Sequence, residues 1–177
     1  MQTLHGIRFL PVLRVHGTLL GVDARWLGAR GLLILGLLMV LAPGRDMLLA
    51  AATLGAIVVT SLGHELGHAL AGRLAGLQVR AVVLGPEGGV TIRAASDQPR
   101  VNFRTALAGP LANALFAGAF AALALCVSPD SFASGYLTQL GTLQLLSGVA
   151  NLVPVGPMDG SKILQAWRAC LSCGSPG

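Results

Sequence analysis

Four long apolar stretches constrain the fold of this chain more than any other feature of its sequence. They cover residues 26–42, 47–75, 103–127 and 135–153. A helix needs about 20 mostly apolar residues to cross the hydrocarbon core of a bilayer. Over the whole chain 54% of the residues are hydrophobic and 11% are charged, which is not the composition of an ordinary soluble globule. We therefore expect an integral membrane protein.

Two further segments have the residue pattern of β-strands. They are residues 7–22, with alternating apolar side chains, and residues 78–93, where two valine-rich runs flank a glycine-rich turn. An open sheet edge cannot face lipid, so these strands are expected at the membrane interface or under other parts of the protein. The predicted fold class is mainly α: a polytopic membrane protein with about four transmembrane helices plus two short membrane-associated β-hairpin or strand regions.

The domain organisation follows from these segments. We expect one membrane-embedded domain over residues 1–177. Its expected parts are an N-terminal strand region (1–25), two helices (26–75), a strand region with a linker (76–100) and the last two spans with a C-terminal helix (101–177). We expect no cleavable signal peptide, because the first part of the chain lacks a compact apolar stretch followed by a small-residue cleavage site. The lone C-x-x-C pair of Cys170 and Cys173 has neither a second half nor a thioredoxin-like context, so no redox or structural-metal role is assigned to it.

The basic residues predict an orientation in the membrane. The chain has a formal net charge of +5, but its arginines are scattered rather than gathered with aromatic residues on one face. Anionic lipid headgroups therefore explain the charge better than nucleic acid does. If the N-terminus is cytoplasmic, only Arg45 of all Lys and Arg residues falls outside, as the positive-inside rule requires. We expect a multi-pass protein of a bacterial plasma (inner) membrane with a cytoplasmic N-terminus.

The second apolar stretch contains the motif His64-Glu65-Leu66-Gly67-His68. Residues four apart share one helix face, so both imidazoles can point a nitrogen at a single ion while Glu65 reaches a water molecule from the adjoining face. These are the parts for metal-assisted hydrolysis, with Glu65 as the general base. The alternative is a pair of buried histidines bonded to neighbouring helices, but a glutamate between them would add desolvation cost without a structural gain.

A third protein ligand has to come from the same depth in the membrane. His64 lies about 25 Å along its helix, toward the cytoplasmic side. The fourth apolar stretch ends on that side in residues 151–160, where Pro154 and Pro157 break the helix just before Asp159. An aspartate there would ordinarily cap the next helix, but the histidine pair lacks a ligand at this depth, so ligation is the better prediction. Two nitrogens and one carboxylate suit a single Zn²⁺ ion, although Fe²⁺, Co²⁺ and Mn²⁺ fit the same spacing.

Three segments of the chain, in this order, resemble the signature motifs of the site-2 protease family of intramembrane zinc metalloproteases. They are residues 64–68, residues 108–113 with the sequence A-G-P-L-A-N, and residues 151–160 with N-x-x-P and M-D-G. The resemblance covers roughly residues 5–170 and implies a short family member without a PDZ domain. It implies His64, His68 and Asp159 as zinc ligands, Glu65 as catalytic base, and hydrolysis of peptide bonds in or near transmembrane segments of membrane-protein substrates.

The same resemblance places Asn113 and Asn151 near the active site, as candidates to hold substrate or to stabilise an oxyanion. Hydrogen bonding between membrane helices explains either asparagine equally well. We expect transmembrane proteins or peptides and membrane lipids as partners, no nucleic acid, and an active site toward the cytoplasmic side. Residues 82–90 are the predicted docking edge for an extended substrate.

Two other classes of protein stay open. One is a membrane metal-binding transporter, in which the same residues bind an ion in transit. Transporters usually contain internal repeats and a polar path across the whole bilayer, and neither is apparent in this sequence. The other is a non-catalytic scaffold that binds membrane partners, against which the intact His-Glu-His set argues.

Overall fold

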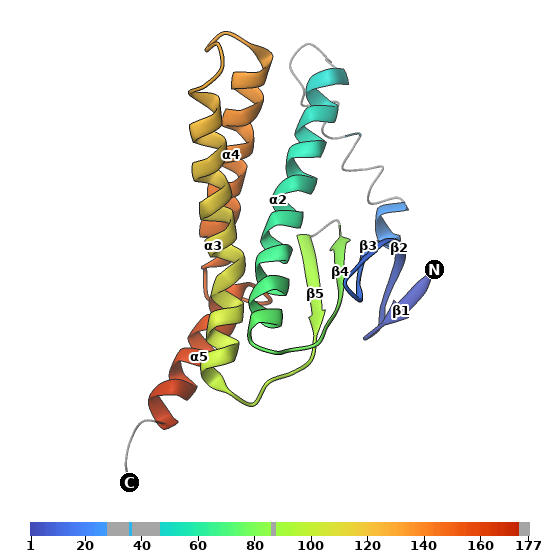
Figure 1. Cartoon of the computed structure of the whole chain (residues 1–177), viewed down its shortest axis with the longest axis vertical. Coiled ribbons are helices and arrows are strands. Elements are labelled where there is room, and N and C mark those ends of the chain that lie inside the picture. Colours follow the sequence, from blue (N-terminus) through green and yellow to red (C-terminus); the bar gives the residue numbers. More distant parts are fainter. Residues whose placement is uncertain (28–35, 37–46, 86–87, 174–177) are drawn as a thin grey trace.

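The structure, a computed structural model, describes residues 1–27, 36, 47–85 and 88–173. Its strands are β1 (Gln2–Leu4), β2 (Ile7–Val15), β3 (Thr18–Asp23), β4 (Val79–Gly85) and β5 (Gly88–Arg93). Its helices are the short 3-10 helix η1 (Ala24–Leu27) and the α-helices α2 (Met47–Leu74), α3 (Pro99–Ala124), α4 (Phe132–Asn151) and α5 (Asp159–Cys173). Figure 1 shows the long helices α2, α3 and α4 running side by side, with the sheet beside the lower half of α2.

The five strands form one sheet in the order β1-β2-β3-β4-β5. Neighbouring strands are antiparallel except β3 and β4, which are parallel and are separated in sequence by α2. A parallel pair needs such a crossover, because its strands start at the same end of the sheet. Both predicted strand regions are strands, but they join in this single sheet. Its core contains Phe9, Ala81, Val83 and Ile92.

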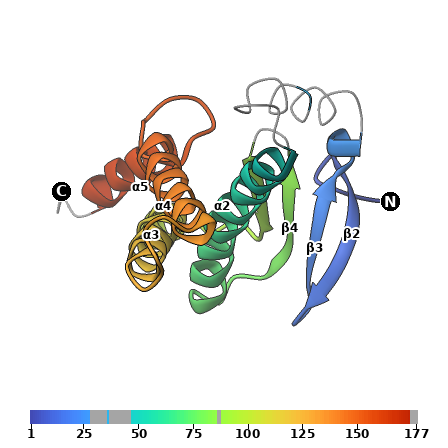
Figure 2. The same cartoon turned by 90° about the horizontal axis from the view of Figure 1, so that it is seen from above.

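Helix α2 lies between the sheet and the other helices (Figure 2). One face of α2 contacts β4 and β5, and another contacts α3 and α4. The glycine of the first motif allows close packing on the helical side. A Cβ at Gly67 would lie 2.6 Å from the carbonyl oxygen of Ala108 and 2.7 Å from the Cβ of Ala112. The motif is therefore held where two helices approach each other closely.

The segment after α4 fixes the start of α5. Helix α4 ends at Asn151 and α5 begins at Asp159, so the expected break around the two prolines is present. A Cβ at Gly160 would lie 2.6 Å from the carbonyl carbon of Val153. The first turn of α5 thus packs directly on the segment that follows α4, and this contact determines where Asp159 lies.

The prediction of about four transmembrane helices is wrong. Among the described residues only α3 is long and apolar enough to cross a membrane, and only 22% of its most apolar window is buried within the protein. The apolar run of α2 is interrupted by His64, Glu65 and His68, and α4 contains several Gln, Thr, Ser and Gly residues. The first predicted stretch, residues 26–42, falls almost entirely outside the described residues.

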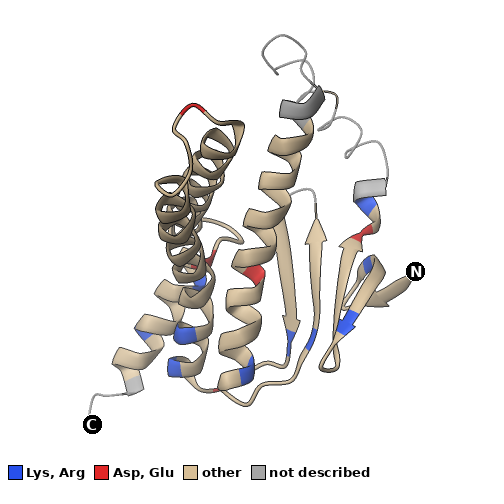
Figure 3. Cartoon of the chain, turned by 45° about the horizontal axis from the view of Figure 1, so that its top comes forward, with Lys and Arg blue, Asp and Glu red and all other residues tan. Residues whose placement is uncertain are grey.

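Most Lys and Arg residues gather at one end of the molecule, where α2 ends and α3 begins (Figure 3). The turn between α3 and α4, at the opposite end, carries Asp130. A candidate membrane helix with its basic residues at one end matches the charge pattern from which the orientation was predicted. Which side of a membrane this end faces stays a prediction.

Candidate metal centre

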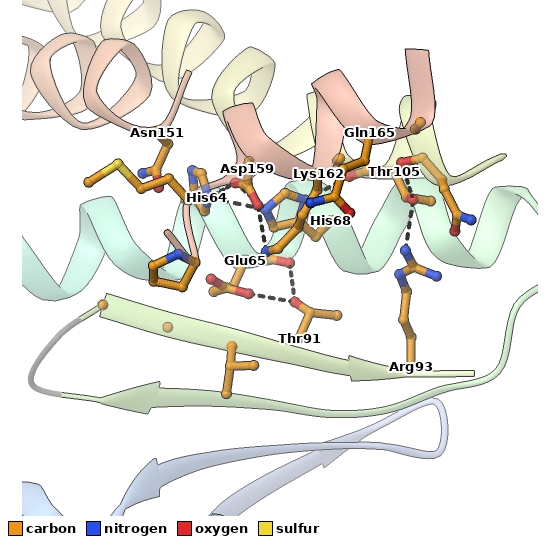
Figure 4. A pocket seen from close by; sticks show the side chains of 18 of the residues that line it. His64, Glu65, His68, Thr91, Arg93, Thr105, Asn151, Asp159, Lys162 and Gln165 are labelled. Carbon is orange, nitrogen blue, oxygen red and sulfur yellow. Dashed lines mark hydrogen bonds and ion pairs between the residues drawn. The ribbon is translucent and has the colours of Figure 1, made fainter. Parts of the chain in front are cut away.

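Two histidines on one face of α2 form the centre of the site (Figure 4). The Nε2 atoms of His64 and His68 lie 3.1 Å apart, and both residues are buried. The Nδ1 atom of His68 lies 2.7 Å from the carbonyl oxygen of Thr105 on α3. A carbonyl can only accept, so this contact assigns the proton of the neutral ring to Nδ1. In that neutral tautomer Nε2 is the unprotonated nitrogen that a metal ligand needs, and a proton held between Nε2 and Asp159 can take the place of the metal.

Asp159, the first residue of α5, provides a third donor atom. Its Oδ2 lies 2.9 Å from the Nε2 of His64 and 2.9 Å from the Nε2 of His68. Its Oδ1 accepts a hydrogen bond of 2.8 Å from Lys162, one turn along α5. Burial alone raises the pKa of the Asp159 carboxyl, but contacts with His64, His68 and Lys162 outweigh burial and hold that pKa well below its ordinary value. Asp159 is therefore an anion, and no backbone N–H among the described residues is capped by its side chain.

The three donor atoms form a triangle with edges of 2.9, 2.9 and 3.1 Å. An unprotonated imidazole nitrogen and a carboxylate oxygen are both acceptors, so they attract each other only through a proton or a cation between them. A tetrahedral Zn²⁺ ion with bonds of 2.0–2.1 Å holds its ligands about 3.3 Å apart. The observed edges are close to that value, and two imidazoles with one carboxylate are a common donor set for zinc. His64, His68 and Asp159 therefore fit a zinc ion.

Gly109 on α3 keeps the space at the histidine nitrogens free. A Cβ at this position would lie 2.7 Å from the Nε2 of His64 and 2.6 Å from the Cε1 of His68. Carbon and nitrogen atoms that are not bonded normally stay more than about 3.4 Å apart. Even a methyl group would therefore displace the imidazole rings, and only glycine leaves room where they converge.

Glu65 lies beside the triangle on the same helix. One carboxylate oxygen of Glu65 and one nitrogen of each histidine all lie within 4.8 Å of one another, so distance alone leaves it a ligand candidate. Its Oε2, however, accepts a hydrogen bond of 2.7 Å from Thr91 on β5. Asp159 already contacts both Nε2 atoms at 2.9 Å. These contacts favour Asp159 over Glu65 as the third donor and leave the Glu65 carboxylate beside the triangle, where it stays the candidate base.

A cavity of about 790 Å³ opens onto these residues. Strand β5, helices α2, α3, α4 and α5, and the segment before α5 contribute to its walls. His64, Glu65, His68 and Asp159 all line it, so a ligand in the cavity would meet the donor atoms and the candidate base together. This concentration of perturbed and convergent polar groups in one cavity is the usual sign of an active site.

The two asparagines from the sequence lie in different places. Asn151, the last residue of α4, lines the cavity, and its Nδ2 donates a hydrogen bond of 3.0 Å to the carbonyl oxygen of Ser147. Asn113 is fully buried between α3 and α4, near Gly148, and does not line the cavity. Among the described residues its amide has no hydrogen-bond partner. The structure therefore brings Asn151 to the site and leaves Asn113 in the helix interface.

Sequence reasoning missed three residues that support the site: Thr91, Thr105 and Lys162. The spacing of Lys162, three residues after Asp159 in a helix, was an available signal, because such residues are neighbours on one face. Thr105 acts through its backbone carbonyl, which leaves no mark in the sequence. Thr91 lies in a predicted strand, but alternation alone does not tell which face of a strand packs on a helix.

Comparison with known proteins finds relatives that are named as metalloproteases. Residues 31–153 match the family model described as Peptidase M50B-like. A putative zinc metalloprotease of Mycobacterium tuberculosis, Rip3, is 36% identical over 118 residues, which cover 63% of this chain and 30% of the relative. A zinc metalloprotease of Methanocaldococcus jannaschii is 34% identical over 115 residues, covering 62% of this chain and 32% of the relative. The chain thus spans about a third of the length of these relatives.

A solved structure has the same fold. The site-2 protease from Methanocaldococcus jannaschii superposes with a TM-score of 0.74 at 24% sequence identity. The match covers 94% of this chain and 73% of that protein. At this identity the likeness concerns the fold, and it includes both the sheet and the helices because nearly the whole chain is covered.

Proposed function

Because this chain belongs to the Peptidase M50B-like family, the site-2 proteases, we propose that it is a zinc-dependent protease of the membrane. Its proposed substrates are membrane proteins, cleaved in or near their transmembrane segments. One observation carries the proposal. The donor atoms of His64, His68 and Asp159 lie within 3.1 Å of one another. The carboxylate of Glu65 lies beside them, hydrogen-bonded to Thr91 on β5, and all these side chains line one cavity.

The chain's own residues have separate parts in this reaction. His64, His68 and Asp159 hold the zinc ion. When bound, zinc supplies Lewis-acid chemistry, which lowers the pKa of water and polarises a peptide carbonyl. Glu65 accepts the proton of the attacking water and returns it to the leaving amine, since a general base becomes the general acid of the next step. Asn151 is a candidate donor to the carbonyl oxygen, which requires its amide to leave the Ser147 carbonyl.

Strand β5 is the proposed docking edge. Strand β4 is paired on both sides, with β3 and with β5, so the predicted docking region narrows to β5. The other edge of β5 is unpaired among the described strands, and five of its residues line the cavity. An extended peptide added to this edge would form backbone hydrogen bonds and lie beside Glu65. A substrate helix has to unwind before it can bind in this way, because its carbonyls are otherwise bonded within the helix.

The membrane location rests on the family and on α3. This helix exposes Leu111, Leu115 and Leu123, as a helix in contact with lipid does. We propose that the protein is integral to a bacterial plasma membrane and that the end rich in Lys and Arg faces the cytoplasm. The cavity would then be reached by water from that side.

The Glu65→Gln variant tests the enzymatic function. Membrane protein fragments are compared by mass spectrometry between cells that carry the parent and cells that carry the variant. We expect some fragments to be present with the parent and absent with the variant, because glutamine cannot accept the proton. The zinc content of the purified variant should be unchanged, because glutamine has the same shape as glutamate. Identical fragment sets from both strains, with zinc bound in both proteins, would remove Glu65 as the base.

Proline substitutions test the docking edge. Proline replaces one β5 residue at a time, and only positions whose N–H points away from β4 leave the sheet intact. We expect folded variants of this kind to cleave more slowly, since they lack a donor for the substrate backbone. Thr3→Pro on β1, the opposite edge strand, is the control. Full cleavage by every folded β5 variant would contradict docking at this edge.

A further inference from the structure

One face of strand β5 packs directly on the motif of α2. Successive side chains of a strand point to opposite faces, so positions 89, 91 and 93 share one face. Gly89 is so close to Glu65 that a Cβ there would lie 3.0 Å from the Cδ and 3.0 Å from the Oε1 of the carboxyl group. Two residues on, Thr91 contacts the same glutamate, and Arg93 donates a hydrogen bond of 3.0 Å to the hydroxyl of Thr105.

The hydroxyl of Thr91 has one proton and two neighbours that can accept it. The Oε2 of Glu65 lies 2.7 Å away, and the backbone carbonyl oxygen of Glu65 lies 3.0 Å away. The carboxylate oxygen is closer, and in the ionised form that a general base requires it is the stronger acceptor, since a hydrogen bond to an ionised acceptor is about twice as strong as one between neutral groups. The proton therefore points at the carboxylate. Figure 4 shows this bond spanning the gap between β5 and α2.

This bond decides between two possible roles of the same side chain. An unrestrained Glu65 has three rotatable bonds and lies close enough to His64 and His68 to approach the ion as a further ligand. Thr91 holds one oxygen toward the sheet, while the close approach at Gly89 leaves little space around the other. We propose that Thr91 is a positioning residue that keeps Glu65 off the metal and oriented as the base.

The inference rests on the proposed function and adds a link to substrate binding. The strand that would pair with the substrate is the strand that holds the base, so the substrate backbone and the carboxylate are placed by one element. Correct placement of a catalytic group relative to the bond it attacks is a large part of its effect. Thr91 touches no reacting atom in this scheme; it acts through Glu65.

The kinetic test uses the full chain reconstituted in lipid with a transmembrane peptide that the parent cleaves. We expect Thr91→Val to lower kcat by about 10-fold or more with KM within about twofold, because partners of this kind typically contribute 10- to 100-fold. Thr91→Ser keeps the hydroxyl and should stay within about threefold of the parent. Thr142→Val on α4 removes an exposed hydroxyl that bonds only its own helix, and should change nothing. Parental kcat in Thr91→Val, or an equal loss in Thr91→Ser, would overturn the proposal.

A second measurement needs no cleavage. The purified proteins are loaded with Co²⁺ in place of Zn²⁺, and their visible absorption, which depends on the number and geometry of ligands, is recorded. We expect the spectrum of Thr91→Val to differ from that of the parent, and the difference to vanish in the Thr91→Val/Glu65→Gln double variant, with equal metal content throughout. Superimposable spectra of the parent and Thr91→Val would refute the role of Thr91. A spectral change in a protein that cleaves nothing would instead leave this role standing and reject the proposed protease.

Discussion

Replacing Gly109 by alanine should empty the metal site while leaving the fold in place. The added methyl would lie 2.7 Å from the Nε2 of His64 and 2.6 Å from the Cε1 of His68. Relief of these contacts requires a shift of about 0.7 Å, if the atoms are to reach ordinary van der Waals separation. Metal sites tolerate deviations of only about 0.2 Å in ligand position. At least one imidazole should therefore be lost as a ligand.

We expect the zinc affinity of Gly109→Ala to fall by about 100-fold or more, which corresponds to about 2.8 kcal/mol. The assay is competition for Zn²⁺ with a chromophoric chelator, together with the zinc content of the purified protein. Gly118→Ala is the matched control, because Gly118 lies in the same helix and a Cβ there would meet nothing within 4 Å. Alanine at such a position normally stabilises a helix by about 0.5–1 kcal/mol.

Thermal unfolding in excess chelator separates metal loss from misfolding. In that condition neither parent nor variant holds zinc, so Gly109→Ala should unfold within a few degrees of the parent. Stoichiometric zinc in Gly109→Ala with parental affinity would refute the reasoning. The space at Gly109 would then not be the place where the histidine nitrogens meet the ion.

Three further predictions concern Asp159 and its surroundings. Asp159→Ala should reduce zinc content well below that of the parent, because two histidines alone hold zinc weakly; full occupancy would eliminate Asp159 as a ligand. Lys162→Met should weaken zinc affinity by about 10-fold, since the lysine fixes the second oxygen of the carboxylate, whereas Arg168→Met near the end of α5 should not; equal affinities of the two variants would contradict this. The third prediction concerns pH. The pKa of Asp159 is held below its ordinary value, so its carboxylate stays charged as pH falls. Zinc release, followed with a chelator dye, should therefore begin where imidazoles protonate, below about pH 6. Release that begins only near pH 4 would contradict that order.

The sequence was most informative where local geometry is strict. Helical spacing alone places His64 and His68 on one face, and the two prolines after α4 end that helix just before Asp159. The structure brings these three side chains together as that reasoning expected. Their roles as ligands stay a proposal, to be tested by the metal measurements.

The number of membrane spans was not predictable in the same way. A long apolar stretch does not by itself make a span, because the apolar run of α2 is interrupted by the motif residues and α4 contains several Gln, Thr, Ser and Gly residues. Gln144 on α4 is fully buried, which shows that this helix packs polar groups against its neighbours. Within the described part of the chain, only α3 combines sufficient length and apolarity with a largely exposed surface. The pairing of both strand regions in one sheet also depends on contacts between residues far apart in the sequence, which a local pattern cannot reveal.

The two carboxylates of the site owe their different roles to their partners. Asp159 lies between two imidazole nitrogens and a lysine, a setting that keeps it charged and turned to the centre. Glu65 is bonded to a neutral hydroxyl on β5, so it stays outside the triangle of donor atoms. The donor atoms come from α2 and α5, whereas the group that orients the base comes from the sheet. Changes to the donor residues on these helices should therefore remove metal, and changes to Thr91 on β5 should slow the reaction while metal stays bound. This separation allows metal binding and proton transfer to be tested one at a time in the same protein.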